Sequence, residues 1–498
     1  MIELEFLARA TNTAPMSAVA VLVFEQSGPG DEALDLDVAA SGMISRALGH
    51  GRLTASTHQA IVLTALADPC ISHIVVVGVC GRGMFDEHSM EDAAARAYAT
   101  AKSCGASSLE LRVWSFSAEL SAHAALGLRL ASYRFDKYRT REKAGDRPSL
   151  QAARIVVQDP AQAAKEFAPL ARLADAIGFA RDLVSEPPNV LYPEEFARRV
   201  KALEVLGLQV DILDEQQMVE LGMGALLSVG QGSARQSQLA VMAWYGATRP
   251  SDAPVVVAGK GVCFDSGGLS LKEHEGMWEM KWDMGGAAAV AGLMHVLATR
   301  QAKANVVGIL GLVENMPDGA ASRPGDVVTS MSGQTIEIVD TDSEGRLVLA
   351  DALWYGHQRF NPAALVDVAT LTSAIIIALG HHYAGVFSND DSLANQLLAA
   401  ADREGELLWR MPLHRRYRNL IDSPIADMKN YGGQTAGSIL AALFLEPFAG
   451  STPWAHLDIA PAAWRKESDE AMVPDGATGY GVRLLNRWIA QYHEDRTA

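Results

Sequence analysis

The 498-residue chain contains few cysteines, and their spacing matches no familiar cysteine site. Its four cysteines, Cys70, Cys80, Cys104 and Cys263, are scattered without a CxxC pair. A disulfide framework or a cysteine zinc site uses characteristically spaced cysteines, so reduced thiols fit this pattern better. We therefore expect the protein to occupy a reducing, cytoplasmic compartment.

Signals for secretion and for membrane insertion are also missing. The N-terminus, MIELEFLARA, has acids where a signal peptide has lysine or arginine, and no long apolar core with a cleavage site follows. The most apolar window, AALVDVATLTSAIIIALG from Ala363, is interrupted by Asp367 and several hydroxyl side chains. A buried strand with a following loop or helix explains this window better than a membrane span, so we expect no membrane association.

Basic residues are outnumbered by acidic ones, 42 to 59, which gives a formal net charge of −17. A net acidic surface repels phosphate backbones on average, so we do not expect nucleic acid to be the main ligand, although a local basic patch could still bind it. Hydrophobic residues make up 49% and charged residues 20% of the chain, which is ordinary globular composition and argues against a largely disordered protein.

Several catalytic motifs are absent. HEGMW and HEDRT lack the second histidine of the HExxH zinc helix, and no serine lies in a GxSxG nucleophile elbow. VVVAGKGV has neither the spacing nor the Ser or Thr of a phosphate-binding P-loop. VVVGVCGRG does not follow the GxGxxG dinucleotide fingerprint, so we interpret it as a structural turn. The sequence therefore lacks the HExxH zinc helix, the serine nucleophile elbow and the two nucleotide-binding loops.

The length and the pattern of the chain predict two α/β domains. A chain of 498 residues exceeds what one core usually supports. Short apolar runs alternate with helical segments before residue 160 and again after Pro193, which predicts in each domain a mostly parallel or mixed sheet flanked by helices. Apolar residues at helical spacing predict a linker helix over 161–184. The predicted domains are therefore 1–160, N-terminal, and 185–498, C-terminal and larger, with the site on the latter.

Acidic residues gather in three short segments that follow predicted strands. In IEIVDTDSEGRL, Asp342 and Glu344 are two residues apart, so an extended backbone would point both to the same side. In EMKWDMGG, Asp283 precedes a glycine-rich helix start, and in GKGVCFDSGGLSLK, Asp265 comes five residues after Lys260. Taken singly, these residues are more typical of a helix cap, a solvated turn and a surface lysine.

Convergence of the three segments changes that interpretation. If all of them lie at the carboxyl ends of strands of one sheet, four carboxylates come together, and they cannot all stay ionised without cations. Oxygen-rich clusters of this kind bind divalent metals, and bridging carboxylates suit a pair of ions. The sequence therefore predicts a metal site.

The same segments resemble those of the leucyl aminopeptidase family, also called cytosol aminopeptidases. The family signature NTDAEGRL appears here as DTDSEGRL, Asp340 to Leu347, and GKGVCFDSGGLSLK and MKWDMGGAA match its other two site segments. The resemblance covers the chain from about Arg181 to the end. It continues through DLVSEPPNVLYPEE, DMKNYGGQTAGSILAALFL, WAHLDIAPAAW and GATGYGVRLL. The first 160 residues fit the family's variable N-terminal domain by size and α/β pattern only.

The resemblance implies two divalent metal ions, Mn²⁺ or Zn²⁺, and a definite ligand set. The implied ligands are Lys260, Asp265, Asp283, Asp342 and Glu344. A lysine amine binds a metal only when it is deprotonated, so the ion and burial together must depress the pKa of Lys260 well below its ordinary value.

Two further residues are implied to be catalytic. By resemblance, Lys272 stays charged, polarises the scissile carbonyl and stabilises the tetrahedral oxyanion. Arg346 is implied to hold a bicarbonate ion that acts as general base, since its planar fork pairs with such an anion and keeps its proton. The metals would lower the pKa of a water, and one of them would bind the free α-amine of the substrate.

The implied substrate pocket is less regular than the metal site. Ser373 stands where glycine is common in the family, and Pro461 replaces a glycine, which leaves the side-chain preference open. Asp340 replaces the usual asparagine, and by strand alternation we expect it to face Asp342 and Glu344. By resemblance, the residues lining the pocket are Met280, Thr370, Ser373, Ala460 and Ala463.

The expected function is that of a metal-dependent aminopeptidase that removes leucine-like N-terminal residues from peptides through a metal-activated water. The family resemblance also implies a homohexamer. A DNA-binding or regulatory protein on the same scaffold is the alternative, which a continuous basic stripe on the N-terminal domain would favour. An inactive relative is a third interpretation. The presence of all five implied ligands, Lys272 and Arg346 argues against it, because an inactive site has no physical reason to retain them. The sequence leaves open the native metal and the preference beyond leucine.

Overall fold

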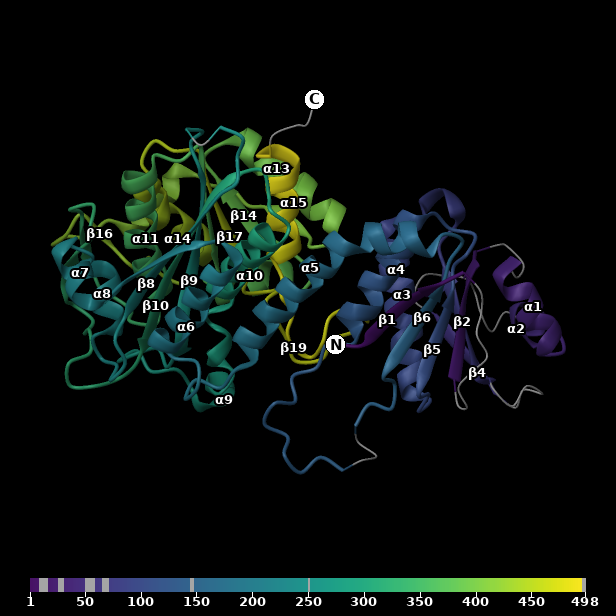
Figure 1. Ribbon diagram of the computed structural model, residues 1–498. Coiled ribbons are helices and arrows are strands. Elements are labelled where there is room, and N and C mark those ends of the chain that lie inside the picture. The colour runs from purple at the N-terminus through teal and green to yellow at the C-terminus, as the bar shows by residue number, and fades with distance from the viewer. Residues whose placement is uncertain are drawn as a thin grey trace. The chain divides into compact units, whose positions relative to one another are not determined.

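A computed structural model describes residues 1–8, 17–25, 31–49, 59–64, 71–143, 147–249 and 251–494. The chain divides into two compact units, both drawn in Figure 1. Unit 1 comprises Met1–Ala174 and Lys466–Asp475, and unit 2 comprises Asp175–Arg465 and Gly476–Ala498. Each unit is an α/β assembly with its own sheet, which confirms the predicted fold class.

Unit 1 is built on a six-stranded sheet in the order β1-β6-β5-β2-β4-β3. All neighbouring strands run parallel except β3 and β4. The apolar sequences of β2 and β4 fit central strands that are covered on both faces. The strands are β1 (Glu3–Leu7), β2 (Ser17–Phe24), β3 (Ala60–Leu63), β4 (Ile71–Val79), β5 (Ser108–Arg112) and β6 (Ala152–Val156).

Helices cover both faces of this sheet because alternate residues of its strands point to opposite sides. Ala18, Ala20 and Leu22 join a core with α3 and α4, whereas Val19 and Val21 join a second core with α1 and α2. The helices are α1 (Asp31–Ala39), α2 (Met43–Gly49), α3 (Glu87–Ser103) and α4 (Ala118–Ala131), with the short η1 (Arg82–Met84) before α3.

The long helix α5 (Pro160–Ser185) covers the range for which the sequence predicted a linker helix, 161–184. The chain passes from unit 1 to unit 2 within this helix, after Ala174. Pro187 and Pro188 follow its end, as expected of residues that cannot continue a helix, and α6 (Pro193–Lys201) then begins with a proline in its first turn.

Unit 2 is built on an eight-stranded mixed sheet in the order β15-β14-β17-β13-β9-β10-β8-β7. β9 lies between β13 and β10 and is parallel to both. The strands are β7 (Gln209–Leu213), β8 (Gln238–Tyr245), β9 (Val255–Asp265), β10 (Asn305–Asn315), β13 (Ala364–Ala369), β14 (Ala384–Ser388), β15 (Leu408–Arg410) and β17 (Trp454–Asp458). A small three-stranded sheet contains β11 (Val327–Thr329), β12 (Thr335–Glu337) and β16 (Met428–Lys429). A two-stranded sheet pairs β18 (Trp464–Arg465) with β19 (Gly476–Ala477).

Two apolar cores, one on each face of the large sheet, hold the helices of unit 2 against it. One core contains residues of α6, α10 (Gly285–Thr299), α13 (Asp391–Glu404) and α15 (Val482–Tyr492). The other contains residues of α8 (Gly224–Gly230), α11 (Gly345–Phe360), α12 (Ser373–Leu379) and α14 (Gly437–Leu445). The remaining short elements are η3 (Ala202–Leu206), α7 (Glu215–Glu220), α9 (His274–Met277), η4 (Met280–Trp282), η5 (Arg415–Ile421) and η6 (Glu446–Ala449).

The apolar window that starts at Ala363 forms the buried strand β13 and the helix α12, as the sequence predicted. Across the described ranges, no helix combines the length and the apolar content that crossing a membrane requires. Cys80, Cys104 and Cys263 carry free thiols, while Cys70 lies outside the described residues.

Candidate metal centre

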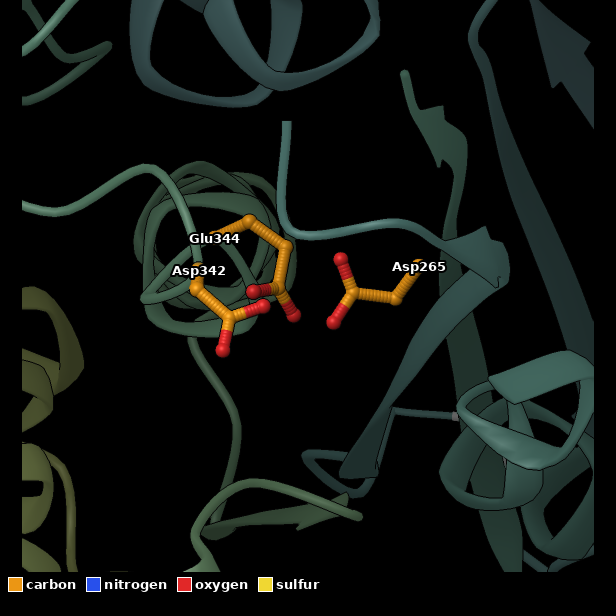
Figure 2. Close-up of side chains that lie close together, drawn as sticks. All are labelled: Asp265, Asp342 and Glu344. Atoms are coloured by element: carbon orange, nitrogen blue, oxygen red, sulfur yellow. The ribbon is translucent and has the colours of Figure 1, made fainter. Parts of the chain in front are cut away.

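Three carboxylates converge in unit 2 from two separate segments. Asp265 is the last residue of β9, and Asp342 and Glu344 lie just before α11. Figure 2 shows the three side chains pointing toward one another, and one oxygen of each lies within 4.8 Å of the others. Asp265 and Glu344 are buried, with 2% and 3% of their surfaces exposed, and Asp342 is partly exposed.

The secondary-structure elements that carry these residues differ from those predicted. Only Asp265 ends a strand of the large sheet, while Lys260 lies in the middle of β9. Asp283 lies between η4 and α10, and Asp342 follows β12, which belongs to a small sheet. The prediction that every acidic segment ends a strand of one sheet was therefore wrong. Apolar patterning locates strands but does not show to which sheet a short strand belongs.

The segment that carries Asp342 is a turn rather than an extended strand. β12 ends at Glu337 and α11 begins at Gly345. The carboxylate of Asp340 accepts hydrogen bonds from the backbone N–H of Asp342 (3.0 Å) and the hydroxyl of Ser343 (3.2 Å). Aspartate commonly closes turns in this way. Strand alternation was therefore the wrong reason for placing Asp340 beside Asp342 and Glu344, because the segment is a turn. Asp340 nevertheless lines the same cleft as these two residues.

Lys260 extends from β9 into a cage of oxygen atoms. Its Nζ lies 2.8 Å from Asp283 Oδ1, from Glu344 Oε1 and from the carbonyl oxygen of Thr370. The amine reaches this position because Gly345 has no side chain: a Cβ there would lie 2.5 Å from Cε of Lys260. Burial lowers the pKa of Lys260, but the carboxylates of Asp283, Glu344 and Asp265 outweigh it and raise the pKa above its ordinary value.

Lys272 lies on another side of the carboxylate cluster. Its Nζ is 2.8 Å from Asp265 Oδ2 and 2.5 Å from Asp342 Oδ1. Burial lowers the pKa of Lys272, and the nearby carboxylates, Asp265 first, more than reverse this effect and hold the ammonium charged. Lys272 thus neutralises two of the carboxylates that the sequence assigned to metal ions, so a cation held there would compete with its ammonium group.

The carboxylates carry unfavourable charge that a cation would relieve. Burial, together with neighbouring acids, raises the pKa of Asp342 to about 7 and raises the pKa of Asp265 and of Asp283. For Glu344, burial also raises the pKa, but the ammonium groups of Lys260 and Lys272 outweigh this effect and lower it.

Asp283 offers the clearest test of whether a cation fits. Its Oδ1 accepts hydrogen bonds from Lys260 and from the hydroxyl of Thr370, whereas its buried Oδ2 has no hydrogen-bond partner among the described residues. A buried unsatisfied carboxylate oxygen is costly, and a bound cation would satisfy it. Oxygen donors with one amine suit a divalent ion, so the residues present fit the predicted cofactor.

Arg346 follows Glu344 in the first turn of α11 and is 6% exposed. Its Nη1 donates a hydrogen bond to the carbonyl oxygen of Asn430 at 2.7 Å, and its buried Nε has no partner among the described residues. Burial lowers the pKa of Arg346 to about 10 in spite of nearby acids. A buried guanidinium with an unused N–H fits an anion such as the predicted bicarbonate.

A cleft of about 830 Å³ opens over these groups. It is lined by the five proposed ligands, Lys272 and Arg346, and by Met280, Thr370, Ser373 and Ala460 of the predicted pocket. Ala463 is 4% exposed, and Gly285 lies beside it: a Cβ on this glycine would be 3.3 Å from that of Ala463. Ala463 is not among the residues that line the cleft.

Four buried polar residues that the sequence analysis did not single out hold the site in place. Asn315 donates to Asp265 Oδ1 and to the carbonyl of Thr341, and Thr341 in turn bonds to Gly267 and Ser270, in the segment that leads to Lys272. Asp458 accepts from the backbone N–H groups of Leu371 and Thr372, beside Thr370. The fourth, Asn430, bonds to the turn of Asp342. Apart from Asn315, these residues lie within segments quoted for the resemblance, but spacing gives no sign of their partners.

Family models match most of the chain. Residues 178–486 match the catalytic domain of the cytosol aminopeptidase family, and residues 20–142 match the N-terminal domain of that family.

Individual relatives agree with this match over nearly full length. The chain is 56% identical over 491 residues to a probable cytosol aminopeptidase of Caulobacter vibrioides, covering 99% of each chain. It is 48% identical over 499 residues to one of Rhizobium leguminosarum, again covering 99% of each. Among solved structures, a mutant of tomato leucine aminopeptidase is 31% identical with a TM-score of 0.86, covering 99% of this chain and 97% of that one. The bottromycin maturation enzyme BotP in complex with Mn is 35% identical with a TM-score of 0.82, covering 96% and 99%.

Proposed function

Because the chain belongs to the cytosol aminopeptidase family and is a metal-dependent aminopeptidase, we propose that its cleft binds two divalent metal ions through five named residues. The proposed ligands are Lys260, Asp265, Asp283, Asp342 and Glu344. The buried Oδ2 of Asp283 and the converging oxygens of the three-carboxylate cluster support this assignment. Mn in the similar BotP structure supports a divalent ion without deciding between Mn²⁺ and Zn²⁺.

When bound, the ions supply Lewis-acid chemistry that polarises a peptide carbonyl and makes water a better nucleophile near neutral pH. Lys260 is the residue whose protonation must change for this to occur. Its amine now serves as counter-charge for Asp283 and Glu344, and it becomes a ligand only after losing its proton. Burial already works in that direction, because it disfavours the ammonium form once the carboxylates are neutralised by other cations.

Neither Lys272 nor Arg346 is a metal ligand in this proposal; Lys272 acts on the substrate and Arg346 holds an anion. The charged Lys272 lines the cleft, where its ammonium stabilises the negative oxygen that develops when the peptide carbonyl is attacked. Arg346 holds an anion, bicarbonate by family resemblance, through the N–H groups that its bond to Asn430 does not use. An anion held there would supply a base for the proton of the attacking water.

The apolar wall of the cleft sets the preference for the N-terminal side chain. Met280, Ser373 and Ala460 line it, and Ile376 adds apolar surface. We propose a leucine-like side chain in this pocket, with Ala463 supporting the wall from behind. Thr370 contributes differently, because its hydroxyl bonds to Asp283 and its carbonyl to Lys260.

The observation that carries the proposal is the meeting of Asp265, Asp342 and Glu344 beside two lysines. It is tested by hydrolysis of leucine p-nitroanilide with chelated protein that is refilled with Zn²⁺, Mn²⁺ or Co²⁺. Activity should disappear on chelation and return with metal, and Glu344→Ala should stay inactive at every metal concentration. Hydrolysis that persists both after chelation and in Glu344→Ala would overturn the proposal.

The remaining expectations concern the whole protein. The aminopeptidase relatives give no support to the DNA-binding alternative. We propose short peptides as substrates and a cytoplasmic location, in keeping with the free thiols and with relatives named cytosol aminopeptidases. A homohexamer is proposed by family resemblance, and light scattering should then give about six times the 53.2 kDa chain mass.

A further inference from the structure

Asn430 is a buried side chain that the proposed chemistry does not use. It follows the short strand β16 and has no exposed surface. Its Oδ1 accepts hydrogen bonds from the backbone N–H groups of Val339 (2.8 Å) and Asp340 (3.3 Å). Its Nδ2 donates to the carbonyl oxygens of Asp340 (2.6 Å) and Ser343 (3.4 Å). One amide thus uses its acceptor and both of its donor hydrogens on a single turn.

That turn carries two of the proposed metal ligands, Asp342 and Glu344. It connects β12 to α11, and residues 339–343 lie outside both elements. Within this segment the N–H of Ser343 bonds to the carbonyl of Asp340, and other backbone groups bond to side chains. Buried backbone N–H and C=O groups need partners, and a side-chain amide can satisfy both kinds at once. Among the described residues, no other side chain is bonded to the backbone at more than one residue of 339–343.

The backbone of Asn430 reaches a second part of the site. Its carbonyl oxygen accepts the hydrogen bond from Nη1 of Arg346 at 2.7 Å, and its N–H donates to the carbonyl of Glu337 at 3.0 Å. The residue is thereby anchored to the end of β12 and bonded to Arg346. The same amino acid therefore fixes the turn of the metal ligands and the direction of the buried guanidinium.

We propose that Asn430 is a positioning residue for the metal centre, whose side-chain amide holds the 339–343 turn in the conformation that aims Asp342 and Glu344 at the ions. This inference rests on the proposed function, because it takes Asp342 and Glu344 as ligands. Residues that orient metal ligands typically change metal affinity or activity by about 10–100-fold when they are replaced.

Asn430→Asp is the sharpest variant, because it preserves the size of the side chain and its Oδ1 acceptor. The change replaces the donating Nδ2 by an oxygen that faces the carbonyl oxygens of Asp340 and Ser343. Two attractive hydrogen bonds to the turn thereby become repulsion between oxygen atoms. Asn430→Ala is the second variant, since it removes both interactions without adding a charge.

Asn305→Asp is the matched control. Asn305 is 6% exposed and is the first residue of β10. Asn315, which bonds to Asp265 in the site, is the last residue of the same strand, so Asn305 lies at the far end of β10. Its amide likewise accepts from a backbone N–H, that of Ala247 (3.3 Å), and donates to a carbonyl, that of Asp252 (3.0 Å). The control therefore imposes the same chemical change on a buried amide away from the site.

The experiment titrates each chelated full-length variant with Co²⁺ and follows visible absorption, with bound metal per chain measured separately. Wild type and Asn305→Asp should bind Co²⁺ equally well, whereas Asn430→Asp and Asn430→Ala should bind at least one ion about 10–100-fold more weakly. Wild-type Co²⁺ affinity in either folded Asn430 variant would overturn the inference, even if its melting temperature fell. Failure of the wild type itself to bind Co²⁺ would instead contradict the proposed function.

Discussion

At the scale of single residues, Lys260 and Lys272 show how position assigns different chemistry to one residue type. Lys260 is 2% exposed and enclosed by Asp283, Glu344 and the carbonyl of Thr370. Lys272 keeps 23% of its side chain exposed and faces the cleft. An enclosed amine can give up its proton to become a ligand, whereas a charged amine at the cleft can meet a substrate.

We predict that Lys260→Met and Lys272→Met separate these two roles. Lys260→Met should lose bound metal, because the amine is a proposed ligand. Lys272→Met should keep its metal and lose about a hundredfold or more in kcat, the usual cost of removing one oxyanion donor. Metal analysis and steady-state kinetics on both purified variants check this. Retention of metal by Lys260→Met and its loss from Lys272→Met would mean that the two roles are exchanged.

His493 gives a pH prediction at the same scale, away from the metal site. Its ring packs edge-on against Trp488 with centroids 4.6 Å apart, and its buried Nε2 has no hydrogen-bond partner among the described residues. Burial lowers the pKa of His493 to about 4. The unfolded chain, in which histidine has a pKa of about 6.5, therefore binds more protons between these two values, and stability is lost as pH falls from about 6.5 to 4.

His493→Phe should remove this part of the acid sensitivity, because the ring stays and the titrating group goes. The measurement is the fall in melting temperature between pH 7.5 and pH 5.0. The fall should be smaller for His493→Phe than for wild type. Equal falls in the two proteins would contradict the assigned pKa direction.

At the scale of elements, the close packing of α10 on the large sheet positions Asp283. The helix begins two residues after Asp283, and Gly286 in its first turn lies against β13. A Cβ on Gly286 would be 2.0 Å from the carbonyl oxygen of Val368, and one on Gly259 of β9 would be 2.6 Å from Cα of Ala287. Glycine at these contacts lets the helix approach the strands closely enough for Asp283 to reach Lys260.

We predict that Gly286→Ala destabilises unit 2 by about 3 kcal/mol, the upper part of the usual range for overpacking, because the clash is with backbone that cannot rotate away. Gly319→Ala is the control, since Gly319 is exposed and a Cβ there has no atom within 4 Å. It should change stability by less than about 0.5 kcal/mol. Denaturant unfolding of both variants checks the difference, and equal midpoints would show that α10 can move away without cost.

At the scale of the whole molecule, the metal centre should contribute to the stability of the folded chain. A ligand that binds only the folded state stabilises it by about 2.7 kcal/mol at a hundred times its dissociation constant. We therefore predict that Mn²⁺ raises the melting temperature of chelated protein by roughly 5 °C, and that Asp283→Asn loses most of this rise. Scanning calorimetry with and without Mn²⁺ provides the measurement. A full rise in Asp283→Asn would remove Asp283 from the ligand set.

Much of the fold was predictable because local patterns dictate it. The alternation of apolar runs with helical segments predicted helix-flanked sheets, the apolar window from Ala363 predicted the buried strand β13, and the spacing of apolar residues predicted α5. The order of the strands was not predictable, nor was the turn of Asp340 in place of an extended segment. Both depend on which segments pair and on which groups remain to be satisfied, and no local pattern specifies these.

The sequence by itself determined the chemistry that is available: the acids and lysines in their ordered segments, the absence of other hydrolase motifs, and the resemblance to an aminopeptidase family. Only the tertiary structure decided which groups touch. It placed Lys260 between Asp283 and Glu344, used Asp340 to close a turn, and brought Asn430 to the backbone of the 339–343 segment. The physical reason is that the sequence fully specifies which side chains are present, residue by residue. A buried polar group, in contrast, bonds to partners from distant segments, and only the packing of the sheets and helices determines which segments lie beside it.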